Sequence, residues 1–133
     1  MKAILSILAV STSIMFANSA ISDFQWKNRL LIVSGATAEL VKEIATEQEG
    51  IRERDLRVFV LSGEGEKKYP VDPELAVEFK KRLSPKAEEP MVYLIGKDSR
   101  TILRWSLEEF SFEKLYSSID AMPMRQREMR EDS

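Results

Sequence analysis

The fold of this chain is decided by the stretch LLIVSG at residues 30–35. Four consecutive apolar residues, closed by a serine and a glycine, are typical of a short strand that is buried on both faces. The spacing then changes, because Leu40 and Ile44 lie four residues apart within residues 37–49 and share one face of a helix. Gly50 stands where a left-handed C-cap would end that helix. A buried strand followed directly by an amphipathic helix is the start of an α/β fold.

Outward from this stretch, apolar runs typical of strands alternate with apolar stripes typical of helices. Three further strands are predicted, at residues 56–61, 91–95 and 101–105. Two further helices are predicted, at residues 73–83 and 112–122. Asp72 and Ser111 are suitable N-caps for them, and Pro73 takes a first helical position, where a proline loses no hydrogen bond. The last two strands are close enough in sequence to form a hairpin.

The order of the elements is therefore β-α-β-α-β-β-α, which predicts an α/β fold. A strand–helix–strand unit places its two strands parallel through a right-handed crossover, and the hairpin then adds antiparallel strands to the same sheet. We expect a mixed four-stranded sheet with helices on both faces. This order is that of the thioredoxin fold, which is an analogy of fold and does not fix a function.

The composition limits the kinds of chemistry that the chain can perform. The 133 residues are enough for one domain, and 44% hydrophobic with 32% charged residues is the balance of a globular protein. The absence of cysteine and histidine excludes thiol redox chemistry, disulfides, and metal sites or catalytic triads built on those residues. The formal net charge of -2 gives no general attraction to nucleic acid. We therefore expect no cofactor, no metal site and no nucleic-acid partner.

The first twenty residues differ from the rest. Lys2 is the only charge before Asp23, two apolar stretches follow it, and small residues stand at 17–20. A positive start, an apolar middle and a small-residue end are the order of a cleaved secretory signal. The stretch is short and broken by hydroxyl residues, which disfavours a membrane anchor. We expect a signal peptide at residues 1–20, a single domain at residues 21–133, a periplasmic or secreted protein, and no membrane span after cleavage.

Four stretches of the chain together resemble one known family. They are WKNRLLI at residues 26–32, RDLRVF at 54–59, YLIGKD at 93–98 and IDAMPMRQREM at 119–129. They are similar to domain-of-unknown-function family 4174, a thioredoxin-like domain of secreted bacterial proteins and of some animal extracellular matrix proteins. The last stretch is the most specific of the four. The resemblance implies a thioredoxin-like fold and export, and it brings no established catalytic residues.

The segment after the first strand is where thioredoxin-like redox proteins carry a nucleophilic cysteine, at a helix N-terminus. Here it holds Ala36 and Thr37 and no thiol. Thr37 is a plausible N-cap, and the N–H groups beside it can hold an anion or a peptide carbonyl. Pro90 precedes the third strand, near the usual place of a cis-proline that exposes backbone to a bound peptide; a trans loop proline without a role is the alternative. These three residues are candidate binding residues, and no catalytic residue is predicted.

Three further binding candidates lie elsewhere. Trp26 covers an edge of the core, or it belongs to an exposed aromatic patch for a partner. Arg125 and Arg127 belong to a charged helical tail that starts at about residue 123 and mixes arginines with methionines. Such a tail docks on a partner or a membrane, or it is a solvated helix that frays at its end. The acids Glu128 and Glu131 dilute its positive charge and favour the solvated helix.

Three functions stay open at this point. The first is a redox-inactive thioredoxin-like domain that binds a protein or peptide in the periplasm, which the element order and the missing cysteines favour. The second is an enzyme that uses hydroxyl, lysine or carboxylate groups, with Thr37 or Lys97 beside an acid of perturbed pKa. The third is a structural component of the cell envelope or of a stress response, which would assemble through the tail.

Overall fold

The computed structural model describes residues 19–84 and 90–132. The elements follow one another as η1 (Ile21–Phe24), β1 (Arg29–Ser34), α2 (Ala38–Thr46), α3 (Gln48–Glu53), β2 (Leu56–Val60), α4 (Pro73–Leu83), β3 (Met91–Ile95), β4 (Ile102–Ser106), α5 (Phe112–Asp120) and α6 (Pro123–Asp132). The expectation of an α/β fold is confirmed. The expected signal peptide lies outside the described residues except for its last two positions.

The four strands form one mixed sheet in the order β2-β1-β3-β4. β1 runs parallel to β2, whereas β3 is antiparallel to both β1 and β4. Ser34, the last residue of β1, therefore lies opposite Met91, the first residue of β3, and Leu30 lies opposite Ile95. The register places the segments that follow β1 and precede β3 at one end of the sheet. The turn after β3 lies at the other end, beside the start of β1.

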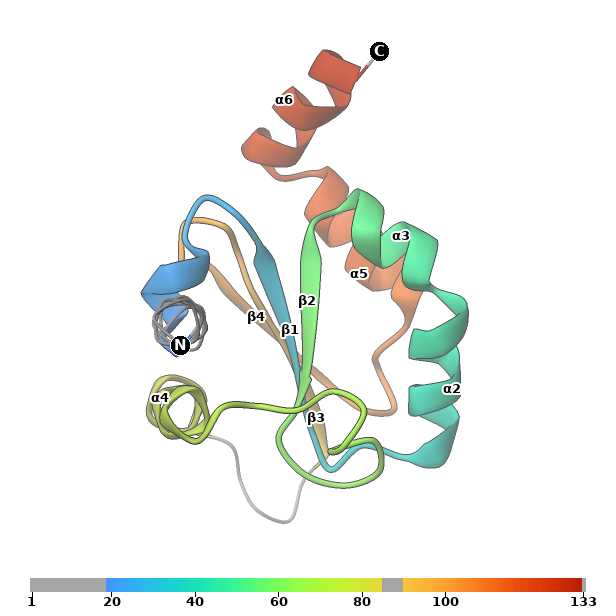
Figure 1. Cartoon of the computed structure of the whole chain (residues 1–133). Coiled ribbons are helices and arrows are strands. Elements are labelled where there is room, and N and C mark those ends of the chain that lie inside the picture. Colours follow the sequence, from blue (N-terminus) through green and yellow to red (C-terminus); the bar gives the residue numbers. More distant parts are fainter. Residues whose placement is uncertain (1–18, 85–89, 133) are drawn as a thin grey trace, which may run out of the picture.

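Helices cover both faces of the sheet, as Figure 1 shows. Alternate residues of a strand point to opposite faces, so Leu31 and Val33 join the core under α2, α3 and α5. Leu30 and Ile32 join the core under η1 and α4. All four are almost fully buried, which is why this stretch of β1 carries no polar residue. The predicted helices on both faces are thus confirmed.

Helix starts follow the predicted caps. The side-chain oxygen of Thr37 accepts a hydrogen bond from the backbone N–H of Leu40 at 3.2 Å. The side chains of Asp72 and Ser111 accept in the same way from N–H groups of α4 and α5. Each cap satisfies one of the N–H groups that a helix leaves without an internal partner.

The prediction that Gly50 ends the first helix is wrong. The chain continues from α2 into α3, and Gly50 lies inside α3 without a left-handed backbone. The reason for a glycine here is close packing, since a Cβ at Gly50 would overlap the hydroxyl of Tyr116 on α5. That hydroxyl donates a hydrogen bond of 2.7 Å to the side chain of Glu47. Local pattern cannot distinguish a capping glycine from one that admits a neighbouring ring.

Candidate functional site

The six candidate binding residues fall at the two ends of the sheet. Ala36 and Thr37 follow β1, and Pro90 precedes β3, so these three lie at the end where β1 finishes. Trp26 precedes β1, and its backbone N–H donates to the carbonyl of Lys97, beyond the far end of β3. Arg125 and Arg127 belong to α6, which stands beyond that same end of the sheet at the top of Figure 1. We call the two regions the cleft end and the charged end.

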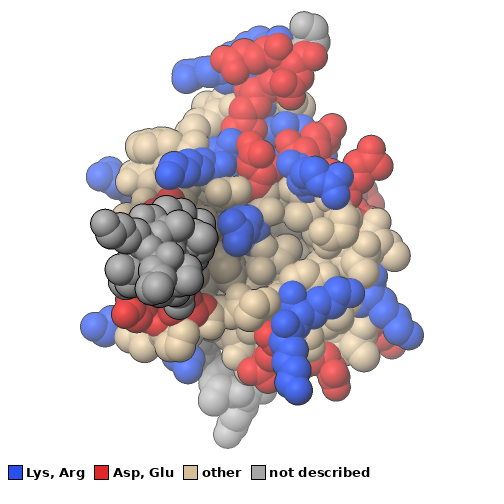
Figure 2. All heavy atoms as spheres, viewed as in Figure 1, with Lys and Arg blue, Asp and Glu red and all other residues tan. Residues whose placement is uncertain are grey.

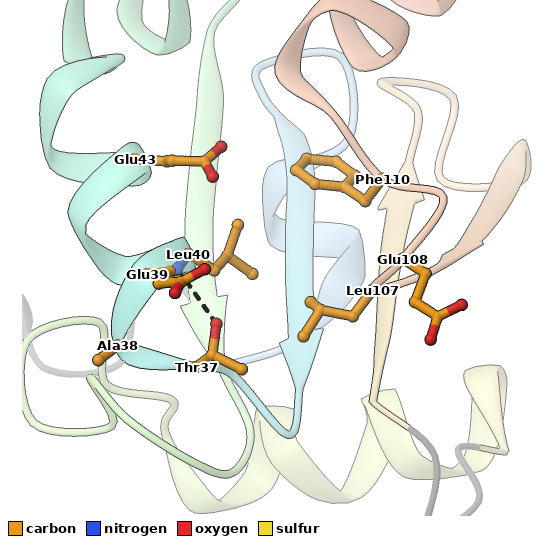
Figure 3. A pocket seen from close by; sticks show the side chains of 8 residues that line it. All are labelled: Thr37, Ala38, Glu39, Leu40, Glu43, Leu107, Glu108 and Phe110. Carbon is orange, nitrogen blue, oxygen red and sulfur yellow. Dashed lines mark hydrogen bonds between the residues drawn. The ribbon is translucent and has the colours of Figure 1, made fainter.

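A cleft of about 490 Å³ opens at the cleft end, between the start of α2 and the loop after β4. Its lining residues are Thr37, Ala38, Glu39, Leu40, Glu43, Leu107, Glu108 and Phe110. Figure 3 shows the side chains of Leu107 and Phe110 pointing toward α2 from the opposite wall. The carboxylate of Glu43 faces Phe110 across the opening, and Glu108 is turned outward at the rim. The cleft therefore has apolar walls and acidic groups around them.

Backbone contacts hold the bottom of this end together. Gly35 has a left-handed φ of 70°, and a Cβ there would stand 3.2 Å from the Cα of Pro90. Glycine is the residue that adopts this backbone conformation without steric cost. Gly35 and Pro90 therefore pack directly against each other, and the structure brings Pro90 beside the segment that holds Ala36 and Thr37. The peptide bond before Pro90 involves Glu89, which lies outside the described residues.

Ala36 is held by the loop that follows β2. Its N–H donates to the carbonyl of Ser62 at 3.0 Å, and its carbonyl accepts from the N–H of Glu64 at 2.9 Å. Gly63 lies so close that a Cβ there would overlap the backbone of Ala36. The side chain of Ala36 is buried. Both backbone groups of Ala36 are thus used within the chain, and the residue supports the cleft from below.

The apolar wall is braced by a row of aromatic rings. The ring of Phe110 packs edge to face against Trp105 of β4, with centroids 5.8 Å apart, and against Phe112 of α5 at 5.3 Å. Edge-to-face pairs of this kind hold rings in defined positions. Ser106 and Glu109 hydrogen-bond to each other at the turn that carries Phe110 into the cleft. The wall is therefore preformed.

The acids of the cleft form no ion pair with the basic residues of the described ranges. Glu39, Glu43 and Glu108 are exposed. Within residues 19–84 and 90–132, none of their carboxylates takes part in an ion pair or accepts a hydrogen bond. The nearby Lys114 donates instead to the backbone carbonyl of Glu109 at 2.9 Å. Negative charge at the cleft is consequently not neutralised from within the described part of the chain.

The charged end is built around a buried lysine and a buried arginine. Lys97, 7% exposed, donates to Asp55 at 2.8 Å and to Glu128 at 2.6 Å. Arg29, only 1% exposed, donates through both terminal nitrogens to Glu128 and also to the carbonyl of Arg54. One carboxylate of α6 is therefore clamped by two cations that flank the central strands.

A second pair of cations continues this network. Arg54 donates to Asp120 with two nitrogens, at 3.1 and 3.0 Å. Arg125 donates to the same carboxylate at 3.1 Å and to the carbonyl of Glu53 at 3.3 Å. The guanidinium of Arg54 also lies over the ring of Tyr116, 3.9 Å from its centre. α3, α5 and α6 are joined here by charge-assisted hydrogen bonds, the strong class of such bonds.

The network lowers the pKa values of two of its carboxyl groups. Burial acts to raise the pKa of Glu128, but the hydrogen bonds and positive charges of Lys97 and Arg29 outweigh it, so this pKa lies below its ordinary value. Burial likewise opposes the fall in the pKa of Asp120, which the hydrogen bonds and charges of Arg54 and Arg125 bring about. Both carboxylates are therefore held in their charged form by the fold.

The expectation of a solvated tail is wrong for Arg125 and Glu128 of α6, whereas Gln126, Arg127 and residues 129–132 are exposed as expected. Arg125 is 3% exposed and Glu128 points into the network, whereas Arg127 is exposed. The physical reason is that Glu128, one of the acids that dilute the positive charge of the tail in sequence, pairs with the buried cations Arg29 and Lys97. Figure 2 shows acidic and basic side chains intermingled over α6 and the end of the molecule below it. The tail is thus fastened to its own chain.

Trp26 is exposed to 61%, so the expectation that it covers an edge of the core is wrong. Its backbone φ of 67° is left-handed, and the turn that it forms directs the side chain outward. The first turn before it is buried through Phe24, which packs against Phe59 at 5.7 Å. Phe24 thus covers the core where Trp26 was expected to do so.

The two groups named for non-thiol catalysis lie at opposite ends of the sheet. Thr37 is at the cleft end and its side-chain oxygen accepts the capping hydrogen bond of α2. Lys97 is at the charged end, with both of its acidic partners in salt bridges. The described part of the chain contains no group of three or more acidic residues that could hold a metal ion. Glu39 and Glu43 line the same cleft as Thr37, but within the described residues no carboxylate is hydrogen-bonded to its hydroxyl.

Sequence reasoning missed Leu107 and Phe110 as cleft residues and Arg29 and Lys97 as buried cations. The signal for the cations was present, since each belongs to one of the four stretches that carry the family resemblance, and the structure gathers charged residues of all four stretches at the charged end. These are Arg29, Arg54, Asp55, Lys97, Asp120, Arg125 and Glu128. No comparable signal pointed to Leu107 and Phe110.

Comparison with known proteins gives one match. The model of a family described as "Domain of unknown function (DUF4174)" matches residues 20–128, which include every element from η1 to β4, all of α5 and the half of α6 that enters the charged end. No curated protein and no solved structure matches the chain. No helix within the described ranges is long and apolar enough to cross a membrane.

Proposed function

The chain belongs to the DUF4174 family, and from that premise we propose that it is a thioredoxin-like domain without thiol chemistry that binds a protein or peptide segment in the cleft beside Thr37. The family description assigns no activity, so the proposal rests on the geometry of the cleft. The single observation that carries it is an open, preformed cleft whose apolar walls lie at the N-terminus of α2.

The topology supports the thioredoxin-like part of the proposal. The strand order β2-β1-β3-β4, with only β3 antiparallel to its neighbours, is the arrangement expected of that fold from the β-α-β-α-β-β-α order. In such a fold the working site lies where the first strand meets the first helix, which is the position of Thr37 here. Because the chain has no cysteine, a binding role is the one that this position retains.

The walls of the cleft support binding of a chain segment. Leu40, Leu107 and Phe110 offer apolar surface, and burying such surface is the main driving force of association. The volume of about 490 Å³ accommodates a few side chains. The rigid aromatic row behind Phe110 lets the cleft bind without first having to form, which lowers the entropic cost of binding.

The compartment belongs to the same proposal. We infer that the domain works after export, in the periplasm or outside the cell, because residues 1–20 have the order of a secretory signal. Cell fractionation checks this inference, and recovery of the chain in the cytoplasm with its first twenty residues intact would contradict it.

Selection from a random peptide library displayed on phage tests the binding function. We expect the purified protein to enrich a set of related peptides, Leu107→Ser to lose them, and Val77→Ser to retain them. Val77 is the matched control because it is an exposed apolar residue on α4, on the other face of the sheet. Backbone amide NMR shifts caused by an enriched peptide should cluster around residues 37–43 and 107–110. Absence of enrichment, or shifts centred elsewhere, would overturn the proposal.

A further inference from the structure

The charge around the cleft indicates which kind of peptide segment binds there. This inference rests on the binding function proposed above. We propose that the occupant is an extended peptide segment that presents a lysine or arginine next to an apolar side chain. The apolar side chain packs on Leu107 and Phe110, and the cation lies among the carboxylates of Glu39, Glu43 and Glu108.

The sign of the charge decides between anionic and cationic occupants. The N-terminus of a helix acts as about half a positive charge and by itself favours anions. At α2, however, Thr37 already caps one N–H, and the two carboxylates of Glu39 and Glu43 stand on the same helix within its first two turns. Lys42 of the same helix does not line the cleft, and the two full negative charges that do line it outweigh half a positive one, because Coulomb energies scale with charge at similar distances. An incoming anion is therefore repelled and a cation attracted.

The acids of the cleft are available to a partner. At the charged end, Asp120 and Glu128 are each bound by two cations of the same chain. Glu39, Glu43 and Glu108 have no such partner within the described ranges, so a ligand cation does not have to displace a cation of these ranges. Complementary charge of this kind gives specificity and speeds encounter more than it adds affinity.

The acids and the apolar walls lie within one cleft, which is why a mixed segment fits better than a purely charged one. Figure 3 shows the carboxylate of Glu43 and the ring of Phe110 facing each other, so a side chain placed between them meets an acid on one side and an aromatic face or edge on the other. A basic side chain suits both, since its aliphatic stem packs on apolar surface and its charged head pairs with a carboxylate. Glu39 lies one turn earlier along α2.

Two parallel selections test the inference. The random peptide library is selected against the wild-type protein and against the double variant Glu39→Gln/Glu43→Gln. We expect the wild type to enrich sequences in which Lys or Arg neighbours an apolar residue, and the double variant to enrich apolar sequences without that basic bias. The matched control is Glu74→Gln/Asp132→Asn, which removes two exposed acids far from the cleft on α4 and α6 and should keep the basic bias.

A thermodynamic cycle then isolates the charge pairing. The leading peptide is synthesised with its basic residue and with norleucine in that place. We expect the norleucine peptide to bind the wild type about fivefold to tenfold more weakly, as two partly exposed charge pairs would produce. This loss should disappear in the double variant, since the interaction has been removed from the other side. High salt should reduce binding of the basic peptide only.

The outcomes separate this inference from the proposed function. Enrichment of peptides that need Leu107 but show no basic bias, or equal binding of the basic and norleucine peptides, would overturn the inference and leave the binding function in place. Enrichment of acidic peptides would overturn the inference in the opposite direction. No cleft-dependent enrichment at all would remove the proposed function itself.

Discussion

The two ends of the sheet use carboxylates in opposite ways. At the charged end, acids of α5 and α6 are bound by Arg29, Arg54, Lys97 and Arg125, and the ion pairs join the helices to the sheet. At the cleft end, Glu39, Glu43 and Glu108 surround apolar walls without a cation from the described residues, and backbone contacts provide the cohesion instead. The difference teaches that carboxylates with partners inside the chain support the fold, whereas those without a partner among the described residues are the ones that would serve recognition under the proposed function.

The ion pairs of the charged end affect stability mainly because the loss of one partner would leave the other charged groups buried with fewer partners. Bringing charges out of water is costly, so a buried network adds modest net stability over apolar residues of the same size. Removing one member leaves the others buried without a partner, which is strongly destabilising. The charged end should therefore be sensitive to substitution of its charged residues, and the cleft end should tolerate substitution of its exposed acids.

The largest expected effect comes from Arg125→Met, which removes a cation from the network with little change in volume. We expect the free energy of unfolding to fall by about 2–3 kcal/mol, because Asp120 loses a partner and the carbonyl of Glu53 loses a donor. The matched control Arg127→Met, at an exposed position of the same helix, should change it by less than about 0.5 kcal/mol. Denaturant unfolding followed by circular dichroism measures both. Equal effects would mean that α6 is not fastened through Arg125.

A smaller effect is expected in the response to acid. Since the pKa of Glu128 is lower in the folded chain than its ordinary value of 4.5, its stabilising contribution is present above that value and is lost as the pH falls through the folded pKa. Asp120 acts in the same direction below its ordinary value of 3.8. Glu128→Gln should lower the free energy of unfolding at neutral pH by about 1–2 kcal/mol and flatten its decline in acid.

Glu43→Gln is the control for the acid response, because Glu43 forms no ion pair with the described residues. We expect its free energy of unfolding to decline with acid at least as steeply as that of the wild type, because the substitution leaves the network intact. Urea unfolding at a series of pH values makes the comparison. If Glu128→Gln showed the wild-type decline, the network would not be the source of the acid sensitivity, and the contrast between the two ends would lose its electrostatic basis.

The fold could be predicted from the sequence because the patterns that specify its strands and helix starts are local. The run at residues 30–35 is apolar throughout, since β1 is covered on both faces, and Thr37, Asp72 and Ser111 cap helices through hydrogen bonds to N–H groups two or three residues away. The pattern of β-branched and apolar residues therefore predicted the layers of the fold, and the capping residues predicted where the helices start. The position of Thr37 at a cleft followed from the same local order.

The charged end could not be predicted because the residues that pair there are far apart in the sequence. Arg29 and Glu128 meet across 99 positions of sequence, and Arg125 and Glu53 across 72. A buried arginine and a solvated one look alike in a charged tail until their partners are known, which is why α6 was expected to be solvated. Leu107 and Phe110 were missed for the same reason, since only the sheet brings the loop after β4 opposite α2.

The smallest expected effect has the opposite sign and concerns the stability of the cleft end. Glu39, Glu43 and Glu47 repeat at every fourth position, and like charges at that spacing each cost a helix a few tenths of a kcal/mol. Glu43→Gln removes the middle charge and relieves both repulsions, so we expect the free energy of unfolding to rise by about 0.5 kcal/mol while affinity for a basic peptide falls. Lys42→Gln on the same helix is the control and should not raise stability. A gain in stability coupled to a loss of binding is the behaviour of residues kept for recognition at a cost to the fold. If Glu43→Gln destabilised the protein, the carboxylate would have an internal role, and the distinction between the two ends would not hold.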